Sequence, residues 1–204
     1  MTPVIETLSP PPREADFIAL CALLRDAVEG GASVGYLVPV RDAEMTGFWQ
    51  GILSEVAEGV RTVLVARDAG RIVGTVQLEL AQKPNSRHRA ELQKLLVLRS
   101  HRGRGLGCAL MLAAETAARR HGRSLLVLDT SASGNAMGLY ARCGYQQVGA
   151  VPRYATDPDG TLIDTVIHYK ELAPEKTSGG CVRERVDGQP LAHARGHAPD
   201  ARRA

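Results

Sequence analysis

Residues 91–107 read ELQKLLVLRSHRGRGLG, which joins a strand pattern to a glycine-rich loop. Successive side chains of a β-strand point to opposite faces, and residues 91–98 alternate accordingly. The alternation predicts Leu92, Leu96 and Leu98 on one face, with Glu91, Gln93, Leu95 and Val97 on the other. The strand is therefore expected to end where the loop begins.

The loop Arg102-Gly103-Arg104-Gly105-Leu106-Gly107 precedes a helix that Gly122 closes. The inward positions of this helix are Leu110, Met111, Ala114, Ala117 and Ala118. Glycines let backbone N–H groups approach a ligand closely, and the first turn of a helix has unpaired N–H donors. Together with the helix dipole and two arginines, these donors predict a phosphate or pyrophosphate site.

Other phosphate loops fit this segment less well. A Walker loop needs Gly-Lys-Ser or Gly-Lys-Thr, which does not occur here. A dinucleotide turn needs G-x-G-x-x-G or G-x-G-x-x-A, but the sixth residue is Cys108 counted from Gly103 and Leu110 counted from Gly105. A turn that binds nothing is the third alternative, and two arginines interleaved with three glycines speak against it.

The flanking sequence predicts an α/β fold. Strands are expected at Pro3–Thr7, Thr62–Ala66, Ile72–Leu80, Ser124–Leu128, Tyr145–Ala150 and Leu162–Leu172. Helices are expected at Asp16–Val28, Ala43–Ala57 and Asn135–Arg142. The lone Trp49 could either pack in the core or line a substrate pocket, and the sequence favours neither.

The composition excludes several classes of protein. The 204 residues are 44% hydrophobic, enough for a core, and the net charge of +3 is too mild to argue for a nucleic-acid or membrane partner. No apolar run reaches the roughly 18 residues of a membrane helix. The start lacks a secretory pattern, and the four cysteines show no zinc spacing, so we expect a cytoplasmic protein with free thiols and no metal.

The composition changes after Leu172. Residues 173–204 contain prolines, glycines and scattered arginines with almost no apolar periodicity. We therefore expect a domain at residues 1–172 and a disordered C-terminal tail at residues 173–204.

Two motifs resemble those of the GNAT N-acetyltransferase superfamily. One is Arg102-x-x-Gly105-x-Gly107 after Leu96-Val97-Leu98, and the other is Leu139-Tyr140-Ala141-Arg142-Cys143-Gly144-Tyr145. Further segments resemble the tabtoxin-resistance acetyltransferases, which acetylate a small β-lactam amino acid. These segments are residues 30–35, 82–85, 89–95 and 128–130. The likeness covers the chain from about Val4 to Leu172.

The resemblance implies a mixed, mostly antiparallel sheet of about seven strands flanked by helices. Two adjacent parallel strands, here Glu91–Leu98 and Ser124–Asp129, would splay apart to admit the pantetheine arm of acetyl-CoA. Cofactor contacts are then expected from Val97, Leu98, Arg99, Arg102, Gly103, Arg104, Gly105, Leu106 and Gly107. The superfamily commonly has Asn seven residues before the Tyr, whereas this chain has Ser133 there and Asn135 two residues later, so either could contact CoA.

The resemblance also implies catalytic roles. Glu91 and Asp129 match proposed bases, and which of the two acts is left open. Tyr140 matches the general acid that protonates the leaving thiolate. Each residue also has a structural alternative. Glu91 could form an ion pair with Arg89 or Lys94, Asp129 could cap the following loop, and Tyr140 could be a core residue with a hydrogen-bonded hydroxyl.

We expect an acetyl-CoA-dependent N-acetyltransferase that acts on a small-molecule amine, such as an amino-acid-like toxin or antibiotic. A small acceptor would need a closed pocket built from Gly31–Val38 and Tyr154–Asp159. The alternatives are a protein N-terminal or lysine acetyltransferase, whose acceptor would need an open groove, and a CoA-binding regulatory module without turnover. A homodimer is compatible with the sequence.

Overall fold

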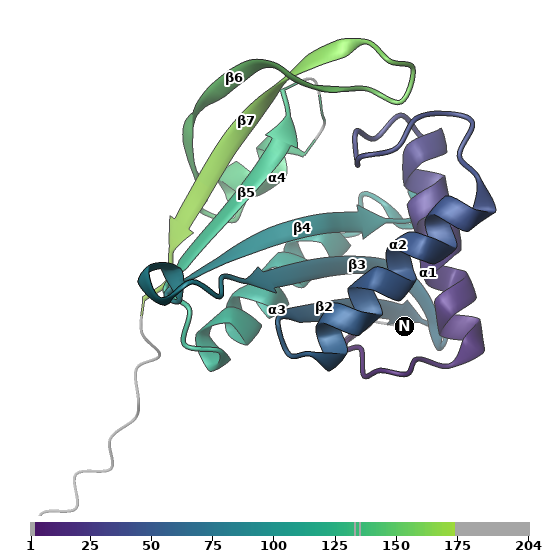
Figure 1. Cartoon of the computed structure of the whole chain (residues 1–204), viewed down its shortest axis with the longest axis horizontal. Helices are drawn as coiled ribbons and strands as arrows, with labels where there is room; N and C mark the ends of the chain where they lie inside the picture. Colours follow the sequence, from purple (N-terminus) through teal and green to yellow (C-terminus); the bar gives the residue numbers. More distant parts are fainter. Residues whose placement is uncertain (1–2, 133, 135, 174–204) are drawn as a thin grey trace, which may run out of the picture.

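A computed structural model describes residues 3–132, 134 and 136–173. In this part of the chain, one seven-stranded sheet has the order β1-β2-β3-β4-β5-β7-β6 (Figure 1). Its strands are β1 (Val4–Thr7), β2 (Arg61–Asp68), β3 (Arg71–Leu80), β4 (Arg89–Val97), β5 (Leu125–Ser131), β6 (Gln146–Thr156) and β7 (Leu162–Glu171). Its helices are α1 (Glu14–Glu29), α2 (Asp42–Ala57), α3 (Leu106–Arg120) and α4 (Met137–Arg142), with short 3-10 turns η1 (Pro84–Ser86) and η2 (Arg99–His101).

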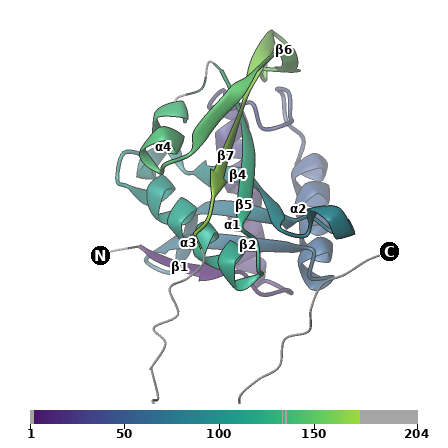
Figure 2. The same cartoon turned by 90° about the vertical axis from the view of Figure 1, so that its left-hand side faces the viewer.

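The helices cover the two faces of the sheet. The helices α1 and α2 lie on one side, and α3 and α4 lie on the other (Figures 1 and 2). Each side has its own apolar core: Leu110 and Met111 of α3 belong to one, and Leu20, Leu24 and Trp49 to the other. The predicted inward positions of α3 are confirmed for Leu110, Met111, Ala114 and Ala118, which are buried.

The strands β4 and β5 run parallel but pair over only three residues. Arg89 pairs with Leu125, Ala90 with Leu126, and Glu91 with Val127. Beyond these pairs both strands continue, to Val97 and Ser131, and they diverge like the arms of a V (Figure 1). We call the opening between residues 92–97 of β4 and residues 128–131 of β5 the V. The predicted fold, including the splayed parallel pair in a mostly antiparallel sheet, is confirmed.

One face assignment in β4 was wrong. Lys94 has a left-handed φ of +49°, and the register against β3 shifts between Thr75 and Gln77, so β4 contains an extra residue there. Because a one-residue insertion exchanges the faces, Leu92 packs in the core beside α3, whereas Leu96 packs in the core beside α1 and α2. The strict alternation read from the sequence does not anticipate the bulge.

The C-terminal hairpin also differs from the prediction. The strand β6 runs to Thr156 rather than ending at Ala150, and its pairing with β7 shifts register at two places. It is one of the two edge strands of the sheet, and most of its residues are exposed. Bulges let a strand continue past positions where the periodicity breaks, which explains the early predicted end.

The predicted disordered tail begins at residue 173, and residues 174–204 lie outside the described residues. Among the described helices, none combines the length and apolar character needed to cross a membrane. The described residues also hold no group of three or more His, Cys, Asp or Glu placed to bind a metal ion.

Candidate functional site

The glycine-rich loop turns the chain from the end of β4 into α3. Gly103 and Gly105 have φ values of +75° and +80°, and Gly105 is the N-cap of α3. A Cβ atom built on either glycine would meet no protein atom within 4 Å, so open space lies in front of the backbone. The loop therefore presents the unpaired N–H groups of a 15-residue helix to a ligand, as the pyrophosphate prediction requires.

Gly107 differs from the other two glycines. A Cβ atom on Gly107 would come within 3.0 Å of Leu139 Cδ2 on α4. This glycine therefore lets α3 and α4 approach each other, which is a packing role rather than the open backbone that the sequence suggested for all three.

The arginines of the loop contact backbone carbonyls. Arg102 Nε donates to Val97 O at 3.0 Å, and Arg104 Nη2 donates to Ser100 O at 3.0 Å. Arg99 pairs instead with Asp26 of α1: its Nε donates to Asp26 Oδ1 at 2.8 Å and its backbone N–H to Asp26 Oδ2 at 2.9 Å. The Arg99 guanidinium therefore pairs with a carboxylate of α1. Burial by itself would raise the pKa of Asp26, but the hydrogen bonds from Arg99 keep that pKa below its usual value.

Val97 lies where β4 and β5 have separated. Leu98 N–H donates to Val73 O of β3, and Val97 stands opposite Gly74. Successive backbone groups of a strand point to opposite sides, so Val97 N–H points away from β3 and into the V. One main-chain donor is thus directed into the opening between the strands.

The two predicted bases share a face of the sheet. Glu91 pairs in register with Val127, and Asp129 lies two residues further along β5, on the same face as Val127. Glu91 is half-buried and Asp129 is exposed. Both side chains therefore lie at the V on the α1/α2 side.

Gln93 holds Glu91 in place. Gln93 Nε2 donates to Glu91 Oε1 at 2.9 Å, and Gln93 Oε1 accepts from Arg61 Nη1 at 2.9 Å. Arg61 is itself buried and pairs with Glu55 and Glu79. Among the described residues, no ion pair of 4.0 Å or less joins Glu91 to Arg89 or Lys94, so the ion-pair alternative for Glu91 was wrong.

Tyr140 lies on the opposite side of the sheet, in the core beside α3, and is 7% exposed. Burial raises the pKa of Tyr140 to about 12, and a hydrogen bond with Thr130 partly opposes the shift. The hydroxyl therefore keeps its proton at neutral pH. Tyr140 and the two carboxylates therefore lie on opposite faces of the sheet.

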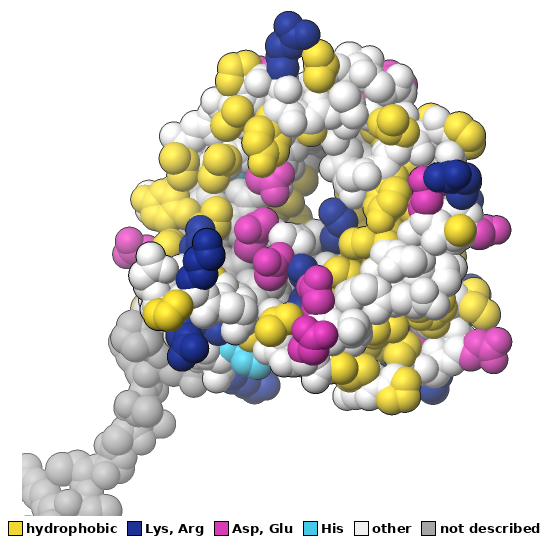
Figure 3. Space-filling view, in the orientation of Figure 1, with side chains coloured by type: hydrophobic (Ala, Val, Ile, Leu, Met, Phe, Trp, Pro, Cys, Tyr) yellow, Lys and Arg dark blue, Asp and Glu magenta, His cyan; other side chains and the backbone are white. Residues whose placement is uncertain are grey.

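Sequence reasoning gave Lys94 no functional role. The Lys94 ammonium lies 5.8 Å from the centroid of the Phe48 ring, and Phe48 packs edge-on against Tyr36 with ring centroids 6.0 Å apart. Figure 3 shows this face hollowed, with acidic side chains gathered beside the hollow. A lysine in a strand otherwise rich in leucine was the available signal.

Other candidates take structural places. Trp49 is fully buried and donates from Nε1 to Leu20 O at 2.9 Å, so it is a core residue. Ser133 and Asn135, the two candidates for a CoA contact, lie outside the described residues. The cap alternative for Asp129 involves the same loop and stays a prediction.

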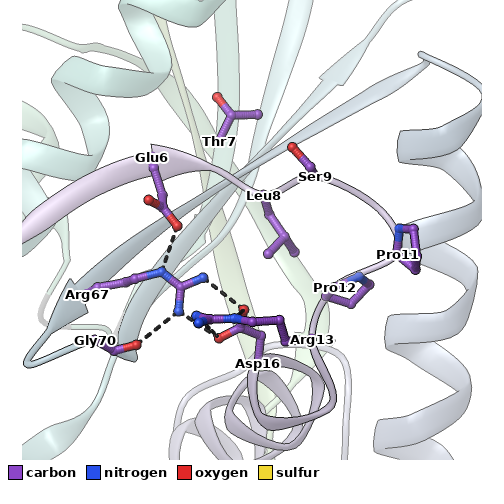
Figure 4. A pocket seen from close by; sticks show the side chains of 10 residues that line it. All are labelled: Glu6, Thr7, Leu8, Ser9, Pro11, Pro12, Arg13, Asp16, Arg67 and Gly70. Carbon is purple, nitrogen blue, oxygen red and sulfur yellow. Dashed lines mark hydrogen bonds and ion pairs between the residues drawn. The ribbon is translucent and has the colours of Figure 1, made fainter.

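A second hollow lies away from the V, between β1, β2 and the start of α1. It is a pocket of about 580 Å³ whose charged side chains pair with one another (Figure 4). Arg67 donates to Asp16 at 2.6 and 2.9 Å, to Glu6 at 2.6 Å and to Gly70 O at 3.2 Å. Because these charged groups already form hydrogen bonds and ion pairs with one another, we assign the pocket a structural role rather than a catalytic one.

Comparisons with known proteins agree with the geometry. The acetyltransferase (GNAT) family model matches residues 20–145. Human N-acetyltransferase 8B is 39% identical over 87 residues, which is 42% of this chain and 38% of that protein. Rat N-acetyltransferase 8 is 32% identical over 116 residues, which is 56% of this chain and 51% of that protein. The matched part thus spans between about two fifths and one half of these curated relatives.

Solved structures share the fold over most of the chain. The ribosomal-protein-alanine N-acetyltransferase from Brucella melitensis is 25% identical, with a TM-score of 0.70 over 83% of this chain and 99% of that one. A phosphinothricin acetyltransferase from Sinorhizobium meliloti, solved with acetyl-CoA, is 19% identical, with a TM-score of 0.70 over 85% of this chain and 90% of that one. A specific closeness to the tabtoxin-resistance enzymes stays a prediction. Since the family model matches more than half of this chain, the chain belongs to the acetyltransferase (GNAT) family.

Proposed function

We propose that this protein transfers the acetyl group of acetyl-CoA to the amine of a small molecule. The open backbone at Gly103 and Gly105 would bind the pyrophosphate, with Arg102, Arg104 and Leu106 beside it. Val97, Leu98 and Arg99 would border the pantetheine arm between the splayed strands. Gly107 would act by holding α4 close to α3, and Ser133 or Asn135 would add a contact to CoA.

The proposed chemistry needs three protein groups. The acceptor amine must lose a proton to become a nucleophile, and Glu91 or Asp129 would take it. As the new N–C bond forms, Val97 N–H would donate to the oxyanion of the tetrahedral intermediate. When the C–S bond breaks, the sulfur keeps the bonding electrons, and Tyr140 would give it a proton. Nitrogen gains the acetyl group and sulfur leaves as a thiol.

The observation that carries this proposal is the division of groups across the V. The two carboxylates lie on the α1/α2 face of the sheet, and Tyr140 lies on the α3 face. The Tyr140 hydroxyl stays protonated at neutral pH because burial raises its pKa. An amine that attacks from one side and a thiolate that leaves on the other would each meet the group it needs.

Two hydrogen bonds support a small acceptor over a peptide. Ser33 Oγ donates to Thr156 O at 2.9 Å, and Val38 N–H donates to Pro158 O at 3.0 Å. They join the α1–α2 loop to the β6–β7 hairpin, beside the face that carries the carboxylates (Figure 1). A groove for an extended peptide would need these segments apart. We further propose a cytoplasmic role in resistance or detoxification, in keeping with the free Cys21, Cys108 and Cys143.

A thiol-release assay tests the proposal. The full chain would be incubated with acetyl-CoA and a panel of amino acids, β-lactam amines and peptides. We expect turnover with small amines, its loss in the double variant Glu91→Gln/Asp129→Asn, and its retention in the exposed Glu58→Gln control. Turnover with peptides alone, or none with any acceptor, would overturn the small-molecule assignment.

A further inference from the structure

Lys94 occupies an unusual backbone and electrostatic position. The bulge of β4 gives it a left-handed φ of +49°, and its side chain is half-buried on the face that carries Glu91 and Asp129. Its ammonium lies over the Phe48 ring, 5.8 Å from the centroid. Among the described residues it forms no ion pair of 4.0 Å or less.

Comparison with Lys170 shows how unusual this is. Lys170 Nζ is 2.7 Å from Glu115 Oε1 and donates to Cys143 O at 2.7 Å. Lys94 has only the Phe48 ring and the more distant charges of Asp129 and Glu91, with the Arg61 cation opposing them. Burial accordingly lowers the pKa of Lys94. A partly desolvated cation without a close anion is costly unless something else pairs with it.

The surroundings of Lys94 define that partner. The Phe48 ring offers aromatic surface beside the ammonium, Tyr36 packs against Phe48, and the two carboxylates lie on the same side of the sheet. A ligand that fits this arrangement carries an amine for the carboxylates and an anionic group for Lys94. Planar carboxylates meet ammonium groups through short, charge-assisted hydrogen bonds.

We propose that the acceptor amine also carries a carboxylate, and that the Lys94 ammonium pairs with it while Phe48 packs against the carbon chain between the two groups. Lys94 is then a specificity-determining residue. This inference rests on the proposed function, because it names the substrate class of the same site.

The test compares each amine with a partner that lacks the negative charge. The probes are an α-amino acid and its carboxamide, and an ω-amino acid and its carboxamide. The measured quantity is the ratio of kcat/KM for acid over amide, determined for the native chain, Lys94→Met, Lys94→Arg and the exposed-loop control Lys83→Met. Comparing this ratio between variants cancels the difference in amine pKa between acid and amide.

We expect Lys94→Met to reduce the acid preference by about 10- to 100-fold, the range of a lost hydrogen bond to a charged group. Lys94→Arg should retain most of the preference, and Lys83→Met all of it. The KM for acetyl-CoA should stay unchanged in every variant, because Lys94 lies away from the glycine-rich loop. Lysine and methionine both lack the freedom of glycine at positive φ, so the exchange adds no new backbone strain.

Two results would overturn the inference while leaving the proposed function intact. One is turnover of amides and acids with equal efficiency by the native chain. The other is an acid preference that Lys94→Met does not change. Absence of turnover with every small amine would instead refute the proposed function itself, so the two failures are distinguishable.

Discussion

Lys170 Nζ lies 2.7 Å from Glu115 Oε1, which joins β7 to α3 through a carboxylate that is only 4% exposed. The same ammonium donates to Cys143 O at the C-terminal end of α4, the helix that carries Tyr140. One side chain therefore links three elements on the α3 side of the sheet.

Replacing Lys170 by Met should destabilise the protein by about 3–5 kcal/mol, because it leaves a buried carboxylate without its close partner. Arg119 Nη2 lies 3.8 Å from Glu115 Oε2, which is too distant to replace the Lys170 ammonium fully. Urea unfolding followed by circular dichroism measures the change, with Lys83→Met as the matched lysine control. A cost below about 1 kcal/mol, as for surface ion pairs, would contradict this prediction.

The Arg67–Asp16 pair should make stability depend on acid pH. Hydrogen bonds from Arg67 lower the pKa of Asp16 from 3.8 to about 2, and both side chains are largely buried. A lowered pKa stabilises the folded state above pH 4, and this contribution is lost as the pH falls through 2. Asp16→Asn should therefore cost about 2 kcal/mol at pH 7 and little at pH 2.

Unfolding free energies measured between pH 7 and pH 2 check this dependence. The exposed Glu14→Gln variant, in the same first turn of α1, serves as control. Parallel stability curves for Asp16→Asn and the native chain across that range would rule out the assigned pair.

Gly105→Val should abolish acetyl-CoA binding, because a branched side chain would fill the open space in front of the loop. Gly70→Val is a close control: Gly70 has a φ of +81° against +80° for Gly105, and neither has a protein atom within 4 Å of its Cβ position. Both variants should lose about 1–2 kcal/mol of stability through backbone strain. Calorimetric titration with acetyl-CoA should separate them, and equal affinity in the two variants would refute the loop assignment.

Tyr140→Phe should lower turnover by about 100-fold, the lower range for loss of a general acid, and leave acetyl-CoA affinity largely unchanged. The control is Tyr169→Phe, which removes an exposed hydroxyl that donates to Gln146 on the edge strand. Steady-state kinetics and calorimetry give the two readouts. Full activity in Tyr140→Phe would remove Tyr140 from the mechanism.

Much of the fold could be predicted because its signals are local. The glycine-rich loop is an example: Gly103 and Gly105 adopt positive φ, which the residue type itself permits, and α3 begins directly after Gly105. The helices α1 and α2 and the β2–β3 hairpin likewise lie within a few residues of their predicted bounds. Their hydrogen bonds close within one segment or across one short turn.

The missed features depend on partners distant in the sequence. The bulge at Lys94 exists because β4 must match β3, and it moves Leu96 to the opposite face from Leu92. The contact between Gly107 and Leu139 requires α4 to pack on α3. Neither follows from periodicity, since both depend on how elements dock.

By itself the sequence determined the order of elements, the glycine-rich loop before α3 and the residue types available for chemistry, because these depend on backbone freedom and local hydrogen bonding. Only the tertiary structure decided that Glu91 and Asp129 share one face, that Tyr140 lies on the other, and that Lys94 stands beside Phe48 without a close anion. Strand register and helix docking set these relationships, and both are fixed by burying apolar surface from segments far apart in the chain.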